Sequence, residues 1–348
     1  MESIVNPYFA DILAQPAALR KAISQFPHPV IEKIQEKQNN GDFDRIVMTG
    51  MGASYNAAYP ALLQIMEAPV PPSLLNSAEL SHFLNGMLGE RTLLWLNSQS
   101  GRSVELLNIL ENIKTRPVAS TLSFTNNGNS PLALATDFSI PIQAGEESII
   151  STKTYINMLA TNLLSAIQLV GGDLSAAVRD LQLVADEMEA YLTNWDSHVK
   201  QIDNLLSNVN RLFILGRGPS MSTVWNGSLV CKEAAKFPAE GMIAADFRHG
   251  PLELVAKDVT VIFIEGVLQT SKINKAFAEE IAQFDANVIW VSPIPHSYLP
   301  TLLIPQVPEL FLPIVEILPM QLLSASLAKK HGLIAGQFHR IGKVTSKE

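Results

Sequence analysis

The chain has 348 residues, of which 47% are hydrophobic and only 17% charged, and its formal net charge is −8. This length suggests about two domains, the acidic balance without a basic tract argues against nucleic acid as a partner, and the single cysteine, Cys231, excludes an internal disulfide framework. The first residues lack a signal-peptide pattern and the apolar stretch 302–327 is interrupted by prolines, Glu309 and Glu316, so we expect a cytoplasmic protein without a membrane span.

The first half of the chain alternates between helical and strand-like segments. Residues 7–40 have helical spacing, and further helices are predicted at 55–66, 104–113 and 155–169. A buried parallel strand has a continuous apolar run. Such runs predict strands at 46–49, 92–96, 118–124 and 138–142.

The second half repeats this plan after a helical connector. Strands are predicted at 212–215, 259–264 and 288–291, and helices at 224–235, 275–284 and 310–330. Alternation of strands and helices is typical of parallel sheets with helices on both faces. The predicted fold class is α/β, with two tandem doubly wound, flavodoxin-like domains that each contain a parallel five-stranded sheet.

One phrase occurs twice in the chain. Residues 44–54 read DRIVMTGMGAS and residues 210–220 read NRLFILGRGPS, 166 residues later. A repeat of this length indicates a duplicated domain. A glycine-rich turn between a strand and a helix lets backbone N–H groups approach an anion, so each copy predicts a phosphate or sugar pocket.

A second motif favours phosphate in the first half only. Ser98-Gln99-Ser100-Gly101-Arg102-Ser103 follows a predicted strand and precedes a helix, and its hydroxyls could donate to phosphate oxygens or could merely cap the helix. The second half has Ile264-Glu265-Gly266-Val267 at the corresponding place. We therefore expect a single phosphate site per chain.

Several segments together resemble the sugar isomerase (SIS) family, and in particular the double-SIS isomerase half of glucosamine-6-phosphate synthase. The resemblance runs from about residue 40 to the end of the chain. The segments that carry it are GMGASYNAA (50–58), NSQSGRSVE (97–105), ISTKTY (150–155), LGRGPS (215–220), CKEAAKFPAEGMIAADFRHGPLEL (231–254) and LPMQLLSASLAKKHG (318–332). The domains it implies are a helical lead (1–34), SIS domain 1 (35–172), a helical connector (173–204), SIS domain 2 (205–335) and a tail over the active site (336–348).

The resemblance also implies site residues. It assigns sugar-phosphate binding to Gly52, Ala53, Ser54, Ser98, Gln99, Ser100, Ser103 and Ser151, where Ala53 replaces the family's threonine and loses one hydroxyl. It assigns proton transfer to Glu233, ring opening to His249 of a neighbouring subunit and contact with the sugar carbonyl to Lys343. Two family residues on the Glu233 helix are replaced, a lysine by Val230 and a glutamate by Asn226.

The chemistry of these side chains suits the implied roles, although each has an ordinary alternative. A carboxylate can move a proton between C1 and C2 of an open-chain sugar, but Glu233 could also be an exposed, paired charge. Histidine titrates near neutrality and could protonate a ring oxygen, but His249 could be a loop histidine. Lys343 could polarise the carbonyl or form a Schiff base, or could simply be solvated.

The resulting hypothesis is a homodimeric enzyme acting on a hexose 6-phosphate or amino-sugar 6-phosphate. The preferred reaction is deamination of glucosamine 6-phosphate to fructose 6-phosphate and ammonia, because no cysteine stands near the start to serve a glutaminase. The alternatives are deglycation of a fructosamine 6-phosphate, simple phosphosugar isomerisation and a non-catalytic sugar-phosphate-binding regulator. The seven histidines show no ligand spacing, so neither a metal nor another cofactor is predicted.

Overall fold

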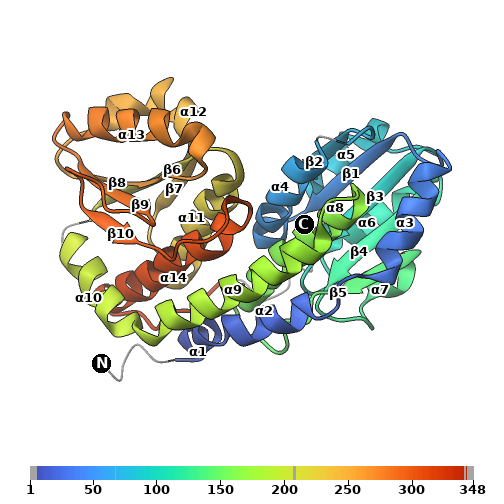
Figure 1. Ribbon diagram of the computed structural model, residues 1–348, viewed down its shortest axis with the longest axis horizontal. Coiled ribbons are helices and arrows are strands. Elements are labelled where there is room, and N and C mark those ends of the chain that lie inside the picture. The colour runs from blue at the N-terminus through green and yellow to red at the C-terminus, as the bar shows by residue number, and fades with distance from the viewer. Residues whose placement is uncertain (1–5, 67, 207–208, 341, 343–348) are drawn as a thin grey trace. The chain divides into compact units, whose positions relative to one another are not determined.

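A computed structural model gives the structure of residues 6–66, 68–206, 209–340 and 342 (Figure 1). The chain forms two compact units. The first unit is built mainly from Ala17–Glu147 and Lys153–Gln182. The second is built mainly from Ser148–Thr152 and Leu183–Phe338, together with the residues up to Pro16.

The first unit contains a parallel five-stranded sheet in the order β2-β1-β3-β4-β5. Gly50 at the end of β1 pairs with Asn97 at the end of β3, so the turns that follow these two strands leave the sheet side by side. The strands are β1 (Arg45–Gly50), β2 (Pro72–Asn76), β3 (Thr92–Asn97), β4 (Ser120–Thr125) and β5 (Phe138–Pro141).

Helices cover both faces of this sheet (Figure 1). On one face, α8 packs against α4 and α3, and every residue of α8 is buried. On the other face, Leu94 and Leu96 of β3 pack against Leu106 and Ile109 of α6. The helices are α3 (Pro29–Asn39), α4 (Gly52–Ile65), α5 (Ser77–His82), α6 (Val104–Asn112), α7 (Pro131–Ala135) and α8 (Lys153–Leu169).

The second unit repeats this topology, with the strand order β10-β9-β8-β6-β7. Phe213, Phe263 and Trp290 form its core with Phe247 of α12 and Phe277 of α13. Its elements are β6 (Arg211–Gly216), α11 (Met221–Ala235), β7 (Ala239–Ile243), α12 (Ala244–Arg248), β8 (Val259–Ile264), α13 (Leu268–Ala282), β9 (Asn287–Ser292), β10 (Thr301–Leu303) and α14 (Leu312–Lys330). The predicted fold class, two doubly wound units with five-stranded parallel sheets, is confirmed.

The remaining helices come at the start of the chain and, in the sequence, between the strands of the two sheets. The predicted helical connector consists of α9 (Leu174–Thr193) and α10 (Trp195–Leu205), and the chain begins with α1 (Pro7–Leu13) and α2 (Gln15–Ile23). Within the second unit, the Tyr8 hydroxyl and the Ser324 hydroxyl share a hydrogen bond of 2.8 Å. The start of the chain is thereby joined to α14.

Helix α14 is the apolar helix that the sequence predicted at 310–330. Pro313 occupies its first turn and Pro319 lies in its interior, so these residues do not by themselves make the segment too interrupted to span a membrane. By length and composition alone Glu309–Lys330 could cross a membrane, but 94% of its apolar window is buried inside the fold. Such burial is what the core helix of a soluble protein shows.

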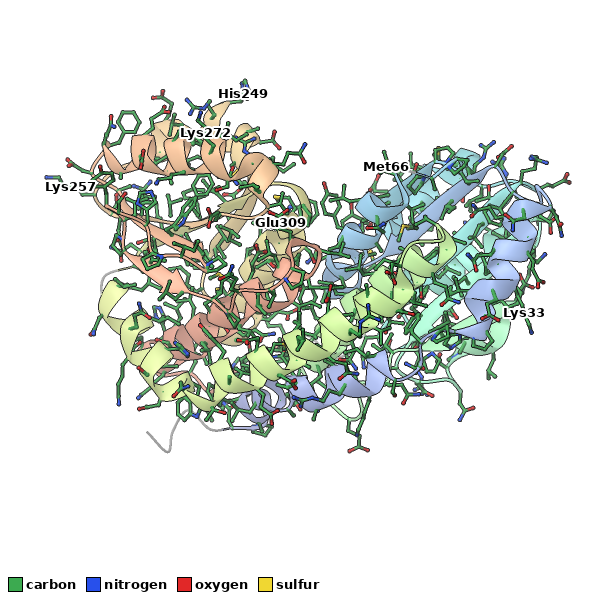
Figure 2. All side chains as sticks on the ribbon, in the orientation of Figure 1. Lys33, Met66, His249, Lys257, Lys272 and Glu309 are labelled. Carbon is green, nitrogen blue, oxygen red and sulfur yellow. The ribbon has the colours of Figure 1, made fainter. Side chains whose placement is uncertain are left out.

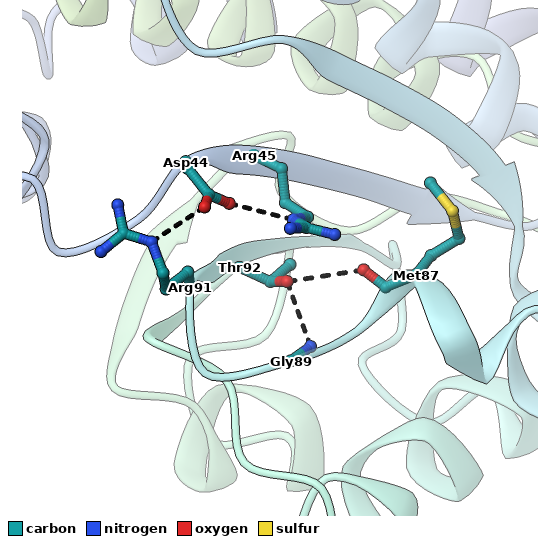
Figure 3. A network of polar contacts seen from close by, with 6 residues as sticks. All are labelled: Asp44, Arg45, Met87, Gly89, Arg91 and Thr92. Atoms are coloured by element: carbon teal, nitrogen blue, oxygen red, sulfur yellow. Dashed lines mark hydrogen bonds and ion pairs between the residues drawn. The ribbon is translucent and has the colours of Figure 1, made fainter.

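An ion pair at the start of the strands reproduces the internal repeat in three dimensions. Asp44 accepts hydrogen bonds from Arg91 Nε (2.8 Å) and Arg45 Nε (3.0 Å), and these contacts lower the pKa of the Asp44 carboxyl (Figure 3). In the second unit, Arg211 at the start of β6 pairs with Asp258, directly before β8. Each pair joins the two central strands of its sheet at their amino ends.

Candidate active site

The turn after β3 gathers the predicted phosphate ligands. The Ser98 and Ser103 hydroxyls lie 3.1 Å apart, and Ser98 Oγ also accepts the Gly101 N–H at 3.1 Å. Ser98 is buried, whereas Ser100 and Ser103 are half-buried. The turn leads directly into the amino terminus of α6, where the helix dipole favours an anion.

The turn after β1 lies next to the turn after β3. Helix α4 begins at Gly52, whose φ is +51°, and no side chain caps its amino terminus. Ser54 Oγ accepts the Gln99 N–H at 3.4 Å, so the two turns are in contact. Ala53 offers only a methyl group. In a doubly wound sheet, ligands bind outside the carboxyl ends of the strands at the point where the strand order reverses, which here lies between β1 and β3.

Gly101 makes the tight turn of the β3–α6 segment feasible. Its φ is +61°, a left-handed conformation that disfavours other residues. A Cβ atom at this position would lie 2.0 Å from Ser130 Oγ and 2.4 Å from Ser130 Cβ. The glycine therefore allows the turn to approach the loop after β4.

The other candidate residues belong to the second unit or lie outside the residues that the structure describes. Ser151 is half-buried and lies in the segment Ser148–Thr152, which belongs to the second unit together with Glu233 and His249. The structure thus brings Ser54 together with the 98–103 turn in the first unit. Lys343 lies outside the described residues.

Glu233 lies in the last turns of α11, where its side chain is half-buried. Lys236 follows at the end of this helix in a left-handed conformation (φ +54°), and its ammonium lies 5.1 Å from the centre of the Phe338 ring. Burial lowers the pKa of Lys236, and the nearby Glu233 carboxylate partly opposes this shift. Sequence reasoning missed this lysine, which places a positive charge beside the candidate base.

The replaced family positions on α11 are both buried. Val230 is 1% exposed, and Asn226 is fully buried, with no hydrogen-bond partner for either amide atom among the described residues. A charged side chain at either position would require a buried partner. The lysine and glutamate that the resemblance implies at these two positions would therefore each need such a partner.

His249 lies directly after α12, next to two residues with contacts to the rest of the unit. Phe247 is fully buried in the core, and Arg248 makes two hydrogen bonds to the Glu280 carboxylate, at 2.9 and 2.6 Å. His249 itself is exposed at the edge of its unit (Figure 2). Pro251 then starts a short 3₁₀ helix, Pro251–Leu254.

Comparison with protein families decides the relationship. The SIS domain model matches residues 42–168 and 205–328, which together make up most of the chain. The chain belongs to the SIS domain family. The two matched ranges coincide with the two sheets and their helices, so the internal repeat is a tandem pair of SIS domains.

Individual relatives agree with this assignment. Glutamine–fructose-6-phosphate aminotransferase (isomerizing) of Thermococcus kodakarensis is 28% identical over 340 residues, which cover 94% of this chain and 56% of the relative. The chain thus spans about half the length of the curated relatives it matches.

Solved structures share the fold. The C-terminal domain of glucosamine-fructose-6-phosphate aminotransferase from Francisella tularensis superposes with a TM-score of 0.84 at 23% identity, covering 94% of this chain and 97% of that domain. Glucosamine-6-phosphate deaminase from Thermotoga maritima gives a TM-score of 0.77 at 20% identity, covering 97% and 99% of the two chains. At these identities the likeness concerns the fold alone.

In the second SIS domain, the point where the strand order reverses, between β6 and β8, carries carboxylates. Glu265 follows β8, in the place that Ser98 has after β3, and it accepts hydrogen bonds from the Ser271 and Ser292 hydroxyls. At the amino terminus of α13, the Leu268 N–H donates to Glu309 at 2.7 Å (Figure 2). These negative charges disfavour a phosphate here, which supports the expectation of one phosphate site per chain.

A buried carboxyl beneath this second switch point makes stability depend on pH. Burial raises the pKa of Glu316 from 4.5 to about 7, although the hydrogen bond from Ser220 at 2.8 Å opposes the shift. The pKa of Glu316 is higher in the folded than in the unfolded state. Its contribution to the free energy of unfolding is therefore complete below pH 4.5 and is lost as the pH rises to about 7. The loss amounts to about 3 kcal/mol.

We therefore expect the Glu316→Gln variant to respond differently to pH. It keeps a side chain of the same shape but cannot ionise, so its urea midpoint should fall less than that of the wild type between about pH 4.5 and about pH 7. Parallel curves for the two proteins would show that Glu316 does not titrate in this range.

Among the described residues, no group of three or more histidine, cysteine, aspartate or glutamate side chains could hold a metal ion. Cys231 is buried, and burial raises the pKa of its thiol to about 12, so it is protonated near neutrality.

Proposed function

We propose that the protein is a phosphosugar isomerase-type enzyme that converts glucosamine 6-phosphate into fructose 6-phosphate and ammonia. One observation carries the proposal: the turn after β3 places three serine hydroxyls before the amino terminus of α6, at the point where the strand order reverses. Hydroxyl donors, backbone N–H groups and a helix dipole together suit a phosphate dianion.

The serines of this turn have different roles, which follow from how deeply each is buried. Ser98 lies at its base, where it accepts the Gly101 N–H and fixes Ser103. Ser100 and Ser103 are half-buried, so their hydroxyls are the ones that meet the phosphate oxygens. Gln99 and Ser54 hold the adjoining turn through the 3.4 Å contact between them. Phosphate binding then fixes the sugar chain for reaction at its other end.

The reaction itself is a proton transfer followed by hydrolysis. His249 of a neighbouring subunit protonates the ring oxygen and opens the pyranose. Glu233 removes the proton from C2 of the open-chain aldehyde and returns it to C1, which gives the C2 imine of fructose 6-phosphate. Water adds to this imine and ammonia leaves. Lys343 assists at the carbonyl.

Lys236 could supply part of the positive charge that is missing because Val230 replaces the family's lysine. The Lys236 ammonium interacts with the Glu233 carboxylate, and its pKa is lowered by burial. A lysine so placed stabilises the ionised form of the base and the negative charge that develops on the substrate. We therefore assign Lys236 an electrostatic role beside Glu233.

Assembly and location complete the proposal. His249 is exposed, next to two residues with contacts to the rest of its unit, which suits a residue donated to a neighbouring active site, so we propose a homodimer. The single cysteine and the burial of Glu309–Lys330 fit a soluble protein of the reducing cytoplasm.

A coupled assay tests the reaction. Purified protein supplied with glucosamine 6-phosphate should release ammonia and fructose 6-phosphate in equal amounts. A parallel panel should contain a fructosamine 6-phosphate and an unsubstituted aldose 6-phosphate. Turnover of either compound without release of ammonia from glucosamine 6-phosphate would replace deamination by deglycation or simple isomerisation. The absence of turnover with all three would leave a sugar-phosphate-binding regulator.

A further inference from the structure

A large polar hollow lies beside the phosphate turn but outside the switch point. Its volume is about 730 Å³, and it opens at the carboxyl ends of β4 and β5, whereas the switch point lies between β1 and β3. Gln99 is the one residue of the 98–103 turn that lines it. The lining residues are Gln99, Asn126, Asn127, Gly128, Pro141, Gln143, Gly145, Glu146 and Glu147.

The lining has a consistent chemistry. Four of the lining residues carry side-chain amides and two are glutamates, and none of them is a lysine, an arginine or a histidine. Amides both donate and accept hydrogen bonds and carboxylates accept them, so the lining suits hydroxyl and amino groups. Without a cation, the two carboxylates disfavour a phosphate or another anion.

The hollow is also held in shape. The Asn126 side chain grips the loop after β5 at two points: Nδ2 donates to the Gly145 carbonyl at 2.7 Å, and Oδ1 accepts the Ala144 N–H at 2.9 Å. This grip accompanies a left-handed Gln143, with a φ of +55°, on the rim of the hollow. A non-glycine residue in this conformation is strained, and such strain tends to collect at ligand sites.

The far end of the loop is fixed as well. Glu147 accepts the Thr154 N–H at 2.9 Å and the Thr154 hydroxyl at 2.6 Å. The buried Lys153 ammonium donates to the Glu146 carbonyl. The backbone that carries the acidic wall is therefore anchored to the first turn of α8, and a ligand would meet a preformed surface.

From these observations we infer a second ligand site for a polyhydroxylated compound that is neutral or cationic and carries no phosphate. An unphosphorylated hexosamine is the simplest example. Its hydroxyls would pair with the amides, and its ammonium would lie near Glu146. The site and the phosphate turn share Gln99, whose carbonyl accepts the Asn126 N–H at 3.0 Å and the Thr125 hydroxyl at 3.2 Å. The inference does not depend on the reaction proposed above.

Calorimetric titration of the full chain with glucosamine and with N-acetylglucosamine tests the site. Both sugars should bind at millimolar concentrations, and saturation with a hexose 6-phosphate should leave this binding in place. Loss of binding in the presence of hexose 6-phosphate would place these sugars in the phosphate site, and the absence of saturable binding would remove the second site. Either result overturns the inference while leaving the ammonia assay unaffected.

Two variants locate the binding. Glu146→Gln should weaken glucosamine binding about fivefold at low salt and leave neutral N-acetylglucosamine unchanged, because only the ammonium interacts with this charge. Glu111→Gln, an exposed change on α6 outside the hollow, is the matched control and should alter neither. Gln143→Gly, which relieves the backbone strain and removes one amide, should weaken both sugars. Unchanged affinities in Glu146→Gln and Gln143→Gly would contradict the assignment.

Discussion

The Glu233→Gln variant is expected to lower kcat for glucosamine 6-phosphate by about a thousandfold, with little change in KM. Glutamine keeps the size of the side chain and its place on α11 but cannot take a proton from C2. KM should hold because phosphate binding is assigned to the 98–103 turn, which belongs to the first unit. Steady-state kinetics of the coupled assay measure both constants.

A neighbouring acid provides the control for this variant. Glu240 is exposed on β7 of the same unit, and Glu240→Gln should keep the kcat of the wild type. A Lys236→Gln variant should lower kcat. It should also move the acid limb of the kcat–pH profile to higher pH, because without the positive charge beside it the Glu233 carboxylate is protonated more readily. Wild-type turnover in Glu233→Gln would exclude Glu233 as the base.

The Gly101→Ala variant is expected to lose most of its affinity for hexose 6-phosphate, by about a hundredfold, and to lose about 3 kcal/mol of stability. The added Cβ would lie 2.0 Å from Ser130 Oγ, so either the turn or the loop after β4 must move. The left-handed backbone adds a cost of its own. Because Gly101 N–H donates to Ser98 Oγ, movement of the turn also shifts the hydroxyl that fixes Ser103.

Gly41 separates the two costs. It has a similar backbone conformation, with a φ of +74°, but a Cβ atom there would meet nothing within 4 Å. Gly41→Ala should therefore cost about 1 kcal/mol in denaturant unfolding and leave sugar-phosphate affinity unchanged. Equal affinities of Gly101→Ala and the wild type would show that the turn does not hold the phosphate.

The interior strands and one edge strand, β5, could be predicted from the sequence, whereas the other three edge strands could not. β1, β3, β6 and β8 are buried along nearly their whole length and have continuous apolar runs, which is the signature of an interior parallel strand. The three edge strands that were missed, β2, β7 and β10, carry mixed sequences such as PSLLN and AEGMI, because one side of each lacks a partner. Their pairing is decided by the neighbouring strand, so no local pattern announces them.

The serine-rich turn after β3 could be recognised in the sequence because all its parts are adjacent. Ser98, Gly101 and Ser103 form their contacts within six residues. The carboxylate block at the second switch point could not, since Glu309 reaches the amino terminus of α13 from 41 residues away. Pro238 gave a weak indication that Lys236 lies near Glu233. A proline two residues after Lys236 favours the end of the helix at that lysine. The left-handed conformation that places Lys236 there depends on tertiary contacts.

A crystal structure with a bound hexose 6-phosphate tests the central claim most directly. It should show one phosphate group per chain, within hydrogen-bond distance of the Ser100 and Ser103 hydroxyls and in front of the amino terminus of α6. Density for the phosphate at the turn after β8, or anywhere away from the turn after β3, would contradict the account.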